Sequence, residues 1–166
     1  LWSNSGYKVA VIDADPQKSL TYWISERKKY YGADDIGINF YNFDIRNLAE
    51  EVKKIKRKYD FIIIDSPPAI TFETLQIIKA SNGVFVPVQP SPLDLMATLP
   101  FLQIAREERK KPLIILNRVM PRAKLTDAMI LRLRYSGAKI ARSRISSKVI
   151  FAESFAVGRG VIDINV

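Results

Sequence analysis

The chain has 166 residues, which is enough for one domain with a buried core. Hydrophobic residues make up 48% and charged residues 26%, the balance of an ordinary globular chain rather than a disordered one. It contains no Cys and no His, which excludes disulfides, thiolate metal sites and catalysis by an imidazole. Carboxylate, hydroxyl, Lys and Arg chemistry remains, the kind that accompanies Mg²⁺ and phosphates.

The positive charge is concentrated at one end of the chain. The net charge is +9, yet residues 1–100 carry 12 basic and 12 acidic side chains. Residues 101–166 carry 14 basic and 5 acidic side chains, so the whole excess lies there. No apolar run approaches the roughly 18 to 20 residues of a membrane-spanning helix, and no membrane partner is expected.

Short apolar runs alternate with segments of helical period along the whole chain. In chain order, the pattern predicts a strand at 8–13, a helix at 18–31, a strand at 38–42 and a helix from Asp44 as N-cap through Ile55. It then predicts a strand at 59–65, a helix at 72–80, a strand at 83–88 and a helix at 93–111, which is kinked or restarted near Pro100. The last predicted elements are a strand at 113–117, a helix at 125–135, a short strand at 139–143 and a helix at 147–155. This alternation predicts an α/β fold, with a mostly parallel sheet covered by helices on both faces. We expect residues 1–166 to form a single domain.

Three acidic residues follow predicted strands. Asp13 and Asp15 come after the first strand, and Asp65 ends the third. Ligands of parallel sheets bind at the carboxyl ends of the strands, and a carboxylate there can hold Mg²⁺ through a water molecule. Each Asp could instead cap the helix or turn that follows it. Because three acids occur at two strand ends, a functional site is the better interpretation.

Several segments resemble one family, and they occur in the order found in that family. These are YKVAVIDADPQKSLTYW at Tyr7–Trp23, DFIIIDSPP at Asp60–Pro68, VPVQPSPLD at Val86–Asp94 and ILNRV at Ile115–Val119. They resemble the ParA-type DNA partition ATPases, a group of P-loop proteins with a deviant Walker motif. The Asp-x-Asp-Pro-Gln core is specific, and its continuation looks most like the small ParF-type proteins. The resemblance implies a P-loop NTPase-like fold that uses ATP and Mg²⁺.

The resemblance also implies roles for the three acids. Asp15 matches the catalytic residue that orients the attacking water near the γ-phosphate. Asp13 matches the accompanying switch residue, near both the nucleotide and Mg²⁺. Asp65 matches the Walker B residue that holds Mg²⁺ through water. These roles are chemically reasonable, since phosphoryl transfer depends mainly on positioning and charge neutralisation.

Further matches fall in the second half of the chain. Asn117 and Arg118 would lie along the adenine. Pro90, Ser91 and Pro92 would belong to the interface of a nucleotide-dependent homodimer.

The sequence lacks the motif that defines a P-loop. No G-x-x-x-x-G-K-[ST] occurs, and the seven glycines include no pair suited to such a loop. In the family, that element would stand immediately before Gly6. We therefore expect that a strand–loop–helix unit of about 30 residues has been lost and that the domain is incomplete at both ends. Two explanations remain: a fragment of a full ATPase, or a degenerate relative that no longer binds nucleotide.

Basic residues crowd the last third of the chain. The candidates for contact with DNA phosphates are Arg122, Lys124, Arg132, Arg134, Lys139, Arg142, Arg144 and Lys148. The alternative is a solvated surface that keeps the protein in solution. No base-reading module is recognisable, so we expect salt-sensitive binding without sequence preference.

The expected function is that of a plasmid or chromosome partition ATPase. Such a protein would be cytoplasmic and nucleoid-associated, would bind DNA non-specifically, and would hydrolyse ATP when a centromere-binding partner of the ParB or ParG kind stimulates it. One alternative is a nucleotide-dead relative or fragment that only dimerises or binds DNA. Another is a MinD-like positioning ATPase.

Overall fold

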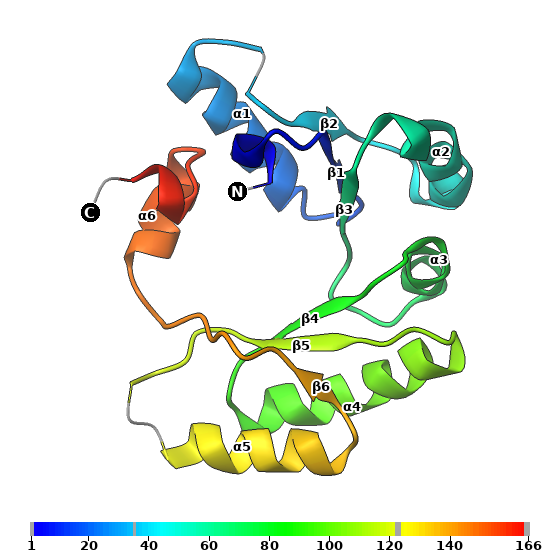
Figure 1. Cartoon of the computed structure of the whole chain (residues 1–166), viewed down its shortest axis with the longest axis vertical. Helices are drawn as coiled ribbons and strands as arrows, with labels where there is room; N and C mark the ends of the chain where they lie inside the picture. Colours follow the sequence, from blue (N-terminus) through cyan, green and yellow to red (C-terminus); the bar gives the residue numbers. More distant parts are fainter. Residues whose placement is uncertain (1, 35, 122–123, 165–166) are drawn as a thin grey trace. The chain divides into compact units, whose positions relative to one another are not determined.

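The computed structural model describes residues 2–34, 36–121 and 124–164, and the chain forms two compact units (Figure 1). The first unit comprises Leu1–Ala80 together with Val149–Val166, and the second comprises Ser81–Lys148. Each unit contains one three-stranded parallel sheet.

The first unit is built on a sheet with the strand order β2-β1-β3. Its elements are β1 (Val9–Asp13), α1 (Ser19–Tyr31), β2 (Asn39–Tyr41), α2 (Leu48–Ile55), β3 (Phe61–Asp65), α3 (Phe72–Ala80) and α6 (Ile150–Ala156), with 3-10 turns at Ser3–Ser5, Ile45–Asn47, Lys56–Lys58 and Val161–Asp163. β1 is the central strand and pairs with β3 over its full length.

Helices cover both faces of this sheet. Side chains of a strand point alternately to its two faces. Ile12 of β1 packs in a cluster with Leu48 and Val52 of α2, whereas Val9 and Val11 pack in a separate cluster with Ile24 of α1. An apolar strand with both faces covered is typical of a parallel α/β sheet.

The second unit has the strand order β4-β5-β6. Its elements are β4 (Phe85–Val88), α4 (Pro92–Glu107), β5 (Leu113–Leu116), α5 (Lys124–Tyr135) and β6 (Lys139–Ile140). Its core joins Ile114 and Leu116 of β5 to Leu102 of α4 and to Leu133 of α5, all at most 1% exposed.

The predicted α/β class with parallel strands is confirmed. Asp44 is an N-cap, since its side chain accepts a hydrogen bond from the Arg46 N–H, although it caps the 3-10 turn that leads into α2. The expected restart near Pro100 is wrong, because α4 is assigned as one helix with Pro100 inside it. The helix expected from Ser147 begins at Ile150, since Ser146 bridges to Val119. The single domain over residues 1–166 stays a prediction.

Candidate functional site

Two of the predicted acids meet at the carboxyl edge of the first sheet. β1 and β3 run in parallel register, so Asp13 lies opposite Asp65 at the last pair of residues. The backbone N–H of Ala14 donates to the carbonyl of Asp65 at 2.9 Å, which extends the pairing by one residue. The register therefore brings the two carboxylates to the same edge.

The Asp13 side chain is completely buried, and its carboxylate accepts three hydrogen bonds. Oδ2 accepts from the backbone N–H of Thr21 at 2.8 Å and from its Oγ1 at 2.5 Å. Oδ1 accepts from the backbone N–H of Asp15 at 3.1 Å. Asp13 thus ties the end of β1 to the first turn of α1 and to the next acid. No sequence pattern singled out Thr21.

Asp15 is half-buried and begins a tight turn that leads into α1. Its Oδ1 accepts from the Gln17 N–H at 2.9 Å, and its carbonyl accepts from the Lys18 N–H at 3.0 Å. Carboxylate-to-backbone bonds of this kind stabilise turns. One of the Asp15 carboxylate oxygens is therefore held by the turn.

The three acids influence one another electrostatically. The Asp65 side chain reaches solvent, yet desolvation by the surrounding protein raises its pKa above the usual range, and the negative charges of Asp13 and Asp15 raise it further. A carboxylate whose neighbours are also negative is stabilised by a bound cation. The charge at this edge therefore fits a divalent metal ion. Within the described ranges, no three His, Cys, Asp or Glu side chains are grouped to hold a metal directly.

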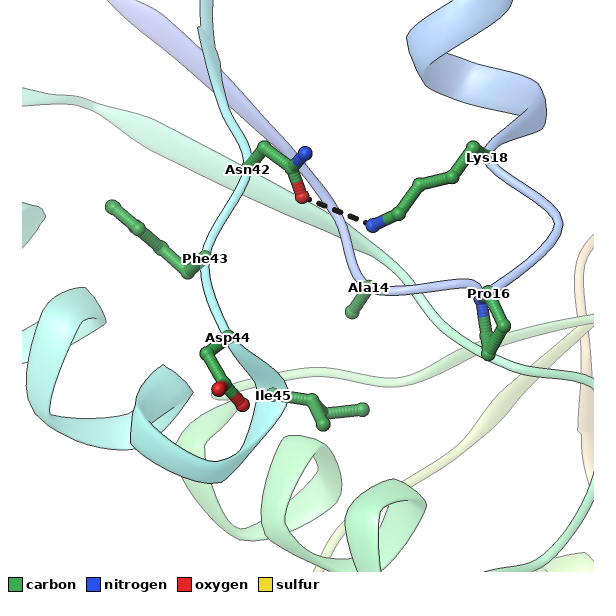
Figure 2. A pocket seen from close by; sticks show the side chains of 7 residues that line it. All are labelled: Ala14, Pro16, Lys18, Asn42, Phe43, Asp44 and Ile45. Carbon is green, nitrogen blue, oxygen red and sulfur yellow. Dashed lines mark hydrogen bonds between the residues drawn. The ribbon is translucent and has the colours of Figure 1, made fainter.

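A pocket of about 340 Å³ lies beside this loop (Figure 2). It is lined by Ala14, Pro16, Lys18, Asn42, Phe43, Asp44 and Ile45. The Lys18 amine donates to the Asn42 Oδ1 at 3.0 Å and to the carbonyl of Asp13 at 3.3 Å. No sequence pattern singled out Lys18 or Asn42, since no sequence spacing relates the loop before α1 to the residue after β2.

Asn117 and Arg118 follow β5 in the second unit. The Asn117 N–H donates to the carbonyl of Val88 at 2.9 Å, so it continues the pairing of β4 and β5. Arg118 has a φ of 51°, which is uncommon outside glycine, and its N–H donates to the Asn117 Oδ1 at 2.9 Å. Strained backbone often marks ligand sites. The acids belong to the first unit and this pair to the second.

The Pro90, Ser91 and Pro92 segment forms the start of α4. The Ser91 Oγ accepts from the Asp94 N–H at 3.1 Å and caps the helix. Pro92 occupies the first helical position, where a missing N–H costs nothing. The beginning of α4 also presents Leu93 and Met96, which are 78% and 70% exposed.

The basic candidates lie in the second unit. Arg122 lies outside the described residues, and Lys124 begins α5. The other six are all exposed: Arg132, Arg134, Lys139, Arg142, Arg144 and Lys148.

Three of these arginines line one pocket of about 310 Å³, together with Leu116, Ile130, Ala138, Ile140 and Ala141. Arg144 lies 4.0 Å from Asp127. The guanidinium groups of Arg134 and Arg142 have no hydrogen-bonding or ionic partner among the residues that the structure describes. A pocket lined by apolar side chains and by unpaired guanidinium groups suits an anion such as a phosphate group.

In the part of the chain that the structure describes, every helix is too short or too polar to cross a membrane.

Comparisons with known proteins point to one family. A family profile described as an AAA domain matches residues 31–115, just over half of the chain. Maintenance of carboxysome distribution protein A from Halothiobacillus neapolitanus is 25% identical over 164 residues, which are 95% of this chain and 74% of that protein. A probable plasmid-partitioning protein ParA from Thermus thermophilus is 21% identical, covering 91% of this chain and 56% of that protein.

Solved structures agree on the fold. Apo McdA from Cyanothece has a TM-score of 0.83 at 18% identity, covering 97% of this chain and 82% of that one. MinD from Pyrococcus horikoshii, solved with Mg-ADP, has a TM-score of 0.76 at 17% identity, covering 97% and 77%. At these identities the likeness establishes the fold alone.

Proposed function

The chain belongs to the ParA/MinD group of AAA-domain ATPases, and from that premise we propose that the whole protein binds MgATP, hydrolyses it and thereby positions a cellular cargo. A plasmid or a chromosome is the proposed cargo. MinD-type positioning is the alternative, and a nucleotide-dead module is a further one.

The observation that carries this proposal is the register of β1 and β3. It places Asp13 opposite Asp65, and the Asp15 N–H, two residues after Asp13, donates to the Asp13 carboxylate. Mg²⁺ at this edge would neutralise charge on the phosphates. Asp65 would hold its water shell, and Asp15 would orient the attacking water. Asp13, the accompanying switch residue near the nucleotide and Mg²⁺, would hold the Asp15 backbone through its buried hydrogen bond.

Two segments of the second unit have proposed roles of their own. Asn117 and Arg118 would contact the adenine, in keeping with the strained backbone at Arg118. Pro90, Ser91 and Pro92 would lie at the interface of a nucleotide-dependent homodimer. The exposed Leu93 beside them supports an association surface.

Hydrolysis by the full-length protein, compared with three variants, tests the enzymatic proposal. We expect Asp15→Ala to retain MgATP and to lose at least about 100-fold in kcat. Asp65→Asn should raise the Mg²⁺ concentration needed for half-maximal binding. Asp34→Asn is the matched control, since Asp34 is exposed and its partner among the residues that the structure describes is Lys28. If the Asp15 variant hydrolyses ATP as fast as the unmodified protein, the catalytic role is wrong.

Nucleotide binding by the 166-residue chain itself separates the alternatives. Because its sequence contains no P-loop motif, we expect this polypeptide to bind MgATP weakly or not at all. Micromolar binding in a calorimetric titration would contradict that expectation. Failure of the full-length protein to bind would favour the nucleotide-dead module.

We further propose that the basic residues of the second unit bind DNA phosphates without sequence preference. The lining of one pocket by Arg134, Arg142 and Arg144 supports this proposal. A DNA-binding protein of this kind would be cytoplasmic and associated with the nucleoid. Its partner would be a centromere-binding protein of the ParB or ParG kind.

Retention on plasmid DNA at low salt tests DNA binding. We expect a variant that combines Arg132→Glu, Arg134→Glu and Arg142→Glu to abolish retention. Loss of one of these arginines alone should reduce the slope of log affinity against log salt concentration by about one. Arg57→Glu makes the charge change of one of these substitutions in the first unit and should have little effect. Unchanged retention of the triple variant would show that these residues form a solvated surface only.

A further inference from the structure

We propose that Lys18 and Asn42 are positioning residues, which hold the loop between β1 and α1 so that it presents Asp15. The kinetic part of this inference rests on the proposed ATP hydrolysis, whereas its structural part does not.

The backbone at Lys18 requires support. Lys18 has a φ of 57° and stands immediately before α1, which begins at Ser19. The left-handed region disfavours any residue with a side chain, because Cβ crowds the backbone. A lysine persists in such a conformation when its surroundings compensate for the strain.

The Lys18 side chain provides contacts that glycine could not. Its amine donates to the carbonyl of Asp13, at the end of β1, and to the Oδ1 of Asn42, just after β2. Figure 2 shows the Lys18 side chain extended along the pocket wall toward Asn42. The amine thus links the ends of two neighbouring strands to the first residue before α1.

The loop has little packing on this side. Ala14, Pro16 and Lys18 line the 340 Å³ pocket, and Pro16 is exposed. A segment that borders open space is held mainly by its hydrogen bonds. The buried Asp13 carboxylate anchors the beginning of the loop, whereas the amine anchors its end.

Two anchors give the loop a defined geometry around Asp15. The Asp13 carboxylate fixes the Asp15 N–H, and the turn from Asp15 to Lys18 closes through the Lys18 N–H. If the amine is removed, the turn loses the link that ties its last residue to the sheet. We expect Asp15 to sample other positions, while β1 stays in place.

Hydrogen exchange on the 166-residue chain tests this directly. Lys18→Gly accommodates the positive φ but lacks the amine, so it separates backbone strain from side-chain anchoring. We expect exchange at the amides of Asp15 and Gln17 to accelerate about tenfold, with no change at Ile12 of β1. Asn42→Ala should give the same pattern. Lys58→Met, an exposed lysine of the same unit, is the control.

A conservative variant distinguishes anchoring from a general effect of mutation. Lys18→Arg keeps a donor of similar reach and should restore most of the protection. If the amides of Asp15 and Gln17 exchange as slowly in the Lys18→Gly variant as in the unmodified chain, the amine does not hold the loop and the inference is wrong. Acceleration at Ile12 as well would also contradict it, because the effect would then be loss of the fold.

Kinetics of the full-length protein provide the second readout. For Lys18→Gly we expect kcat to fall about tenfold with the KM for ATP changed by less than about twofold, and Lys18→Arg to recover kcat. A raised KM with unchanged kcat would instead make Lys18 a ligand-binding residue and would overturn the inference. If the unmodified protein shows no hydrolysis, the proposed function fails, while hydrogen exchange still decides the positioning role.

Discussion

At the scale of single residues, Asp13 is the most constrained acid of the site. Its side chain is fully buried, and the donors to its carboxylate within the described ranges are all uncharged. Burying a carboxylate is costly unless hydrogen bonds compensate for lost water. Thr21 supplies two of the three bonds, so it stabilises the charge on Asp13 as well as the start of α1.

Removing the Thr21 hydroxyl should therefore destabilise the first unit. We expect Thr21→Val to lower the free energy of unfolding by about 1 to 3 kcal/mol, because a buried carboxylate loses a donor. Thr21→Ser keeps the hydroxyl and should cost less. Urea denaturation of the two variants and the unmodified chain measures the difference. Equal stability of Thr21→Val would mean that Asp13 does not depend on this bond.

Gly158 gives a second prediction at this scale, since two constraints exclude a side chain there. Its φ is 65°, and an added Cβ would lie 2.0 Å from the backbone N of Arg27. We expect Gly158→Ala to cost about 2 to 4 kcal/mol, as steric conflict adds to backbone strain. Gly32→Ala is the matched control: its φ is 60°, but nothing lies within 4 Å.

The comparison of the two variants isolates the steric contribution. Gly32→Ala carries the backbone strain alone and should cost only about 1 kcal/mol. Thermal denaturation followed by circular dichroism measures both. Similar losses for the two variants would show that α1 moves aside to accommodate the methyl group.

At the scale of elements, the sequence predicted β1, β3, β4 and β5 well because each is a short apolar run. FIIID and VAVID became β3 and β1, and their equal lengths allowed the register that pairs Asp13 with Asp65. The strand pairing itself could not be predicted, since no local signal separates one six-stranded sheet from two three-stranded ones. The bond between Lys18 and Asn42 was unpredictable for the same reason: it depends on β2 lying beside β1.

Pro100 shows where one of two expectations from a local rule is wrong: the helix does not restart, and a kink stays a prediction. Proline removes one helical hydrogen bond and crowds the preceding turn, which predicted a kink or a restart. In α4, however, Leu95 and Leu102 on either side of it are both buried in the same core cluster. Packing of the flanking turns keeps the segment helical in spite of the proline.

Replacing Pro100 should consequently stabilise the protein. Pro100 is exposed, so Pro100→Ala leaves the core intact and restores a backbone donor. We expect a gain of about 1 to 2 kcal/mol, a part of the cost of a proline inside a helix. Pro92→Ala is the control, because proline at the first helical position loses no bond. Chemical denaturation without nucleotide measures both, and a loss on Pro100→Ala would contradict this reasoning.

At the scale of the whole molecule, the chain returns to its first unit after completing the second. The returning segment contacts α1 at several points: the Trp23 Nε1 donates to the carbonyl of Arg159 at 3.2 Å, and one Arg27 nitrogen donates to both the carbonyl of Gly158 and the carboxylate of Asp163. α1 also begins directly after the loop of Asp15. Attachment of the last residues therefore stabilises the helix that follows the candidate site.

Acid should weaken this attachment. Burial alone would raise the pKa of Asp163. Hydrogen bonds from the Gly160 N–H and from Arg27 lower it, and so do the positive charges of Arg27 and Arg159. Together these lowering effects outweigh burial and hold the pKa below 3.8. A carboxyl with a lowered folded-state pKa binds its proton less readily in the folded than in the unfolded chain. Its stabilising contribution is therefore complete above about pH 4 and is lost as the pH falls through the folded-state pKa.

Comparison of Asp163→Asn with the unmodified chain tests this pH dependence. At pH 7 we expect the substitution to cost roughly 1 kcal/mol of unfolding free energy, since Arg27 loses a charged partner that is only 14% exposed. The difference should shrink as the pH falls below about 4, because the carboxyl of the unmodified chain then becomes neutral as well. Asp34→Asn, which removes the exposed partner of Lys28, should show no such convergence. A difference that stays constant from pH 7 to pH 2.5 would mean that the charge of Asp163 contributes nothing, and that its hydrogen bonds alone attach the segment to α1.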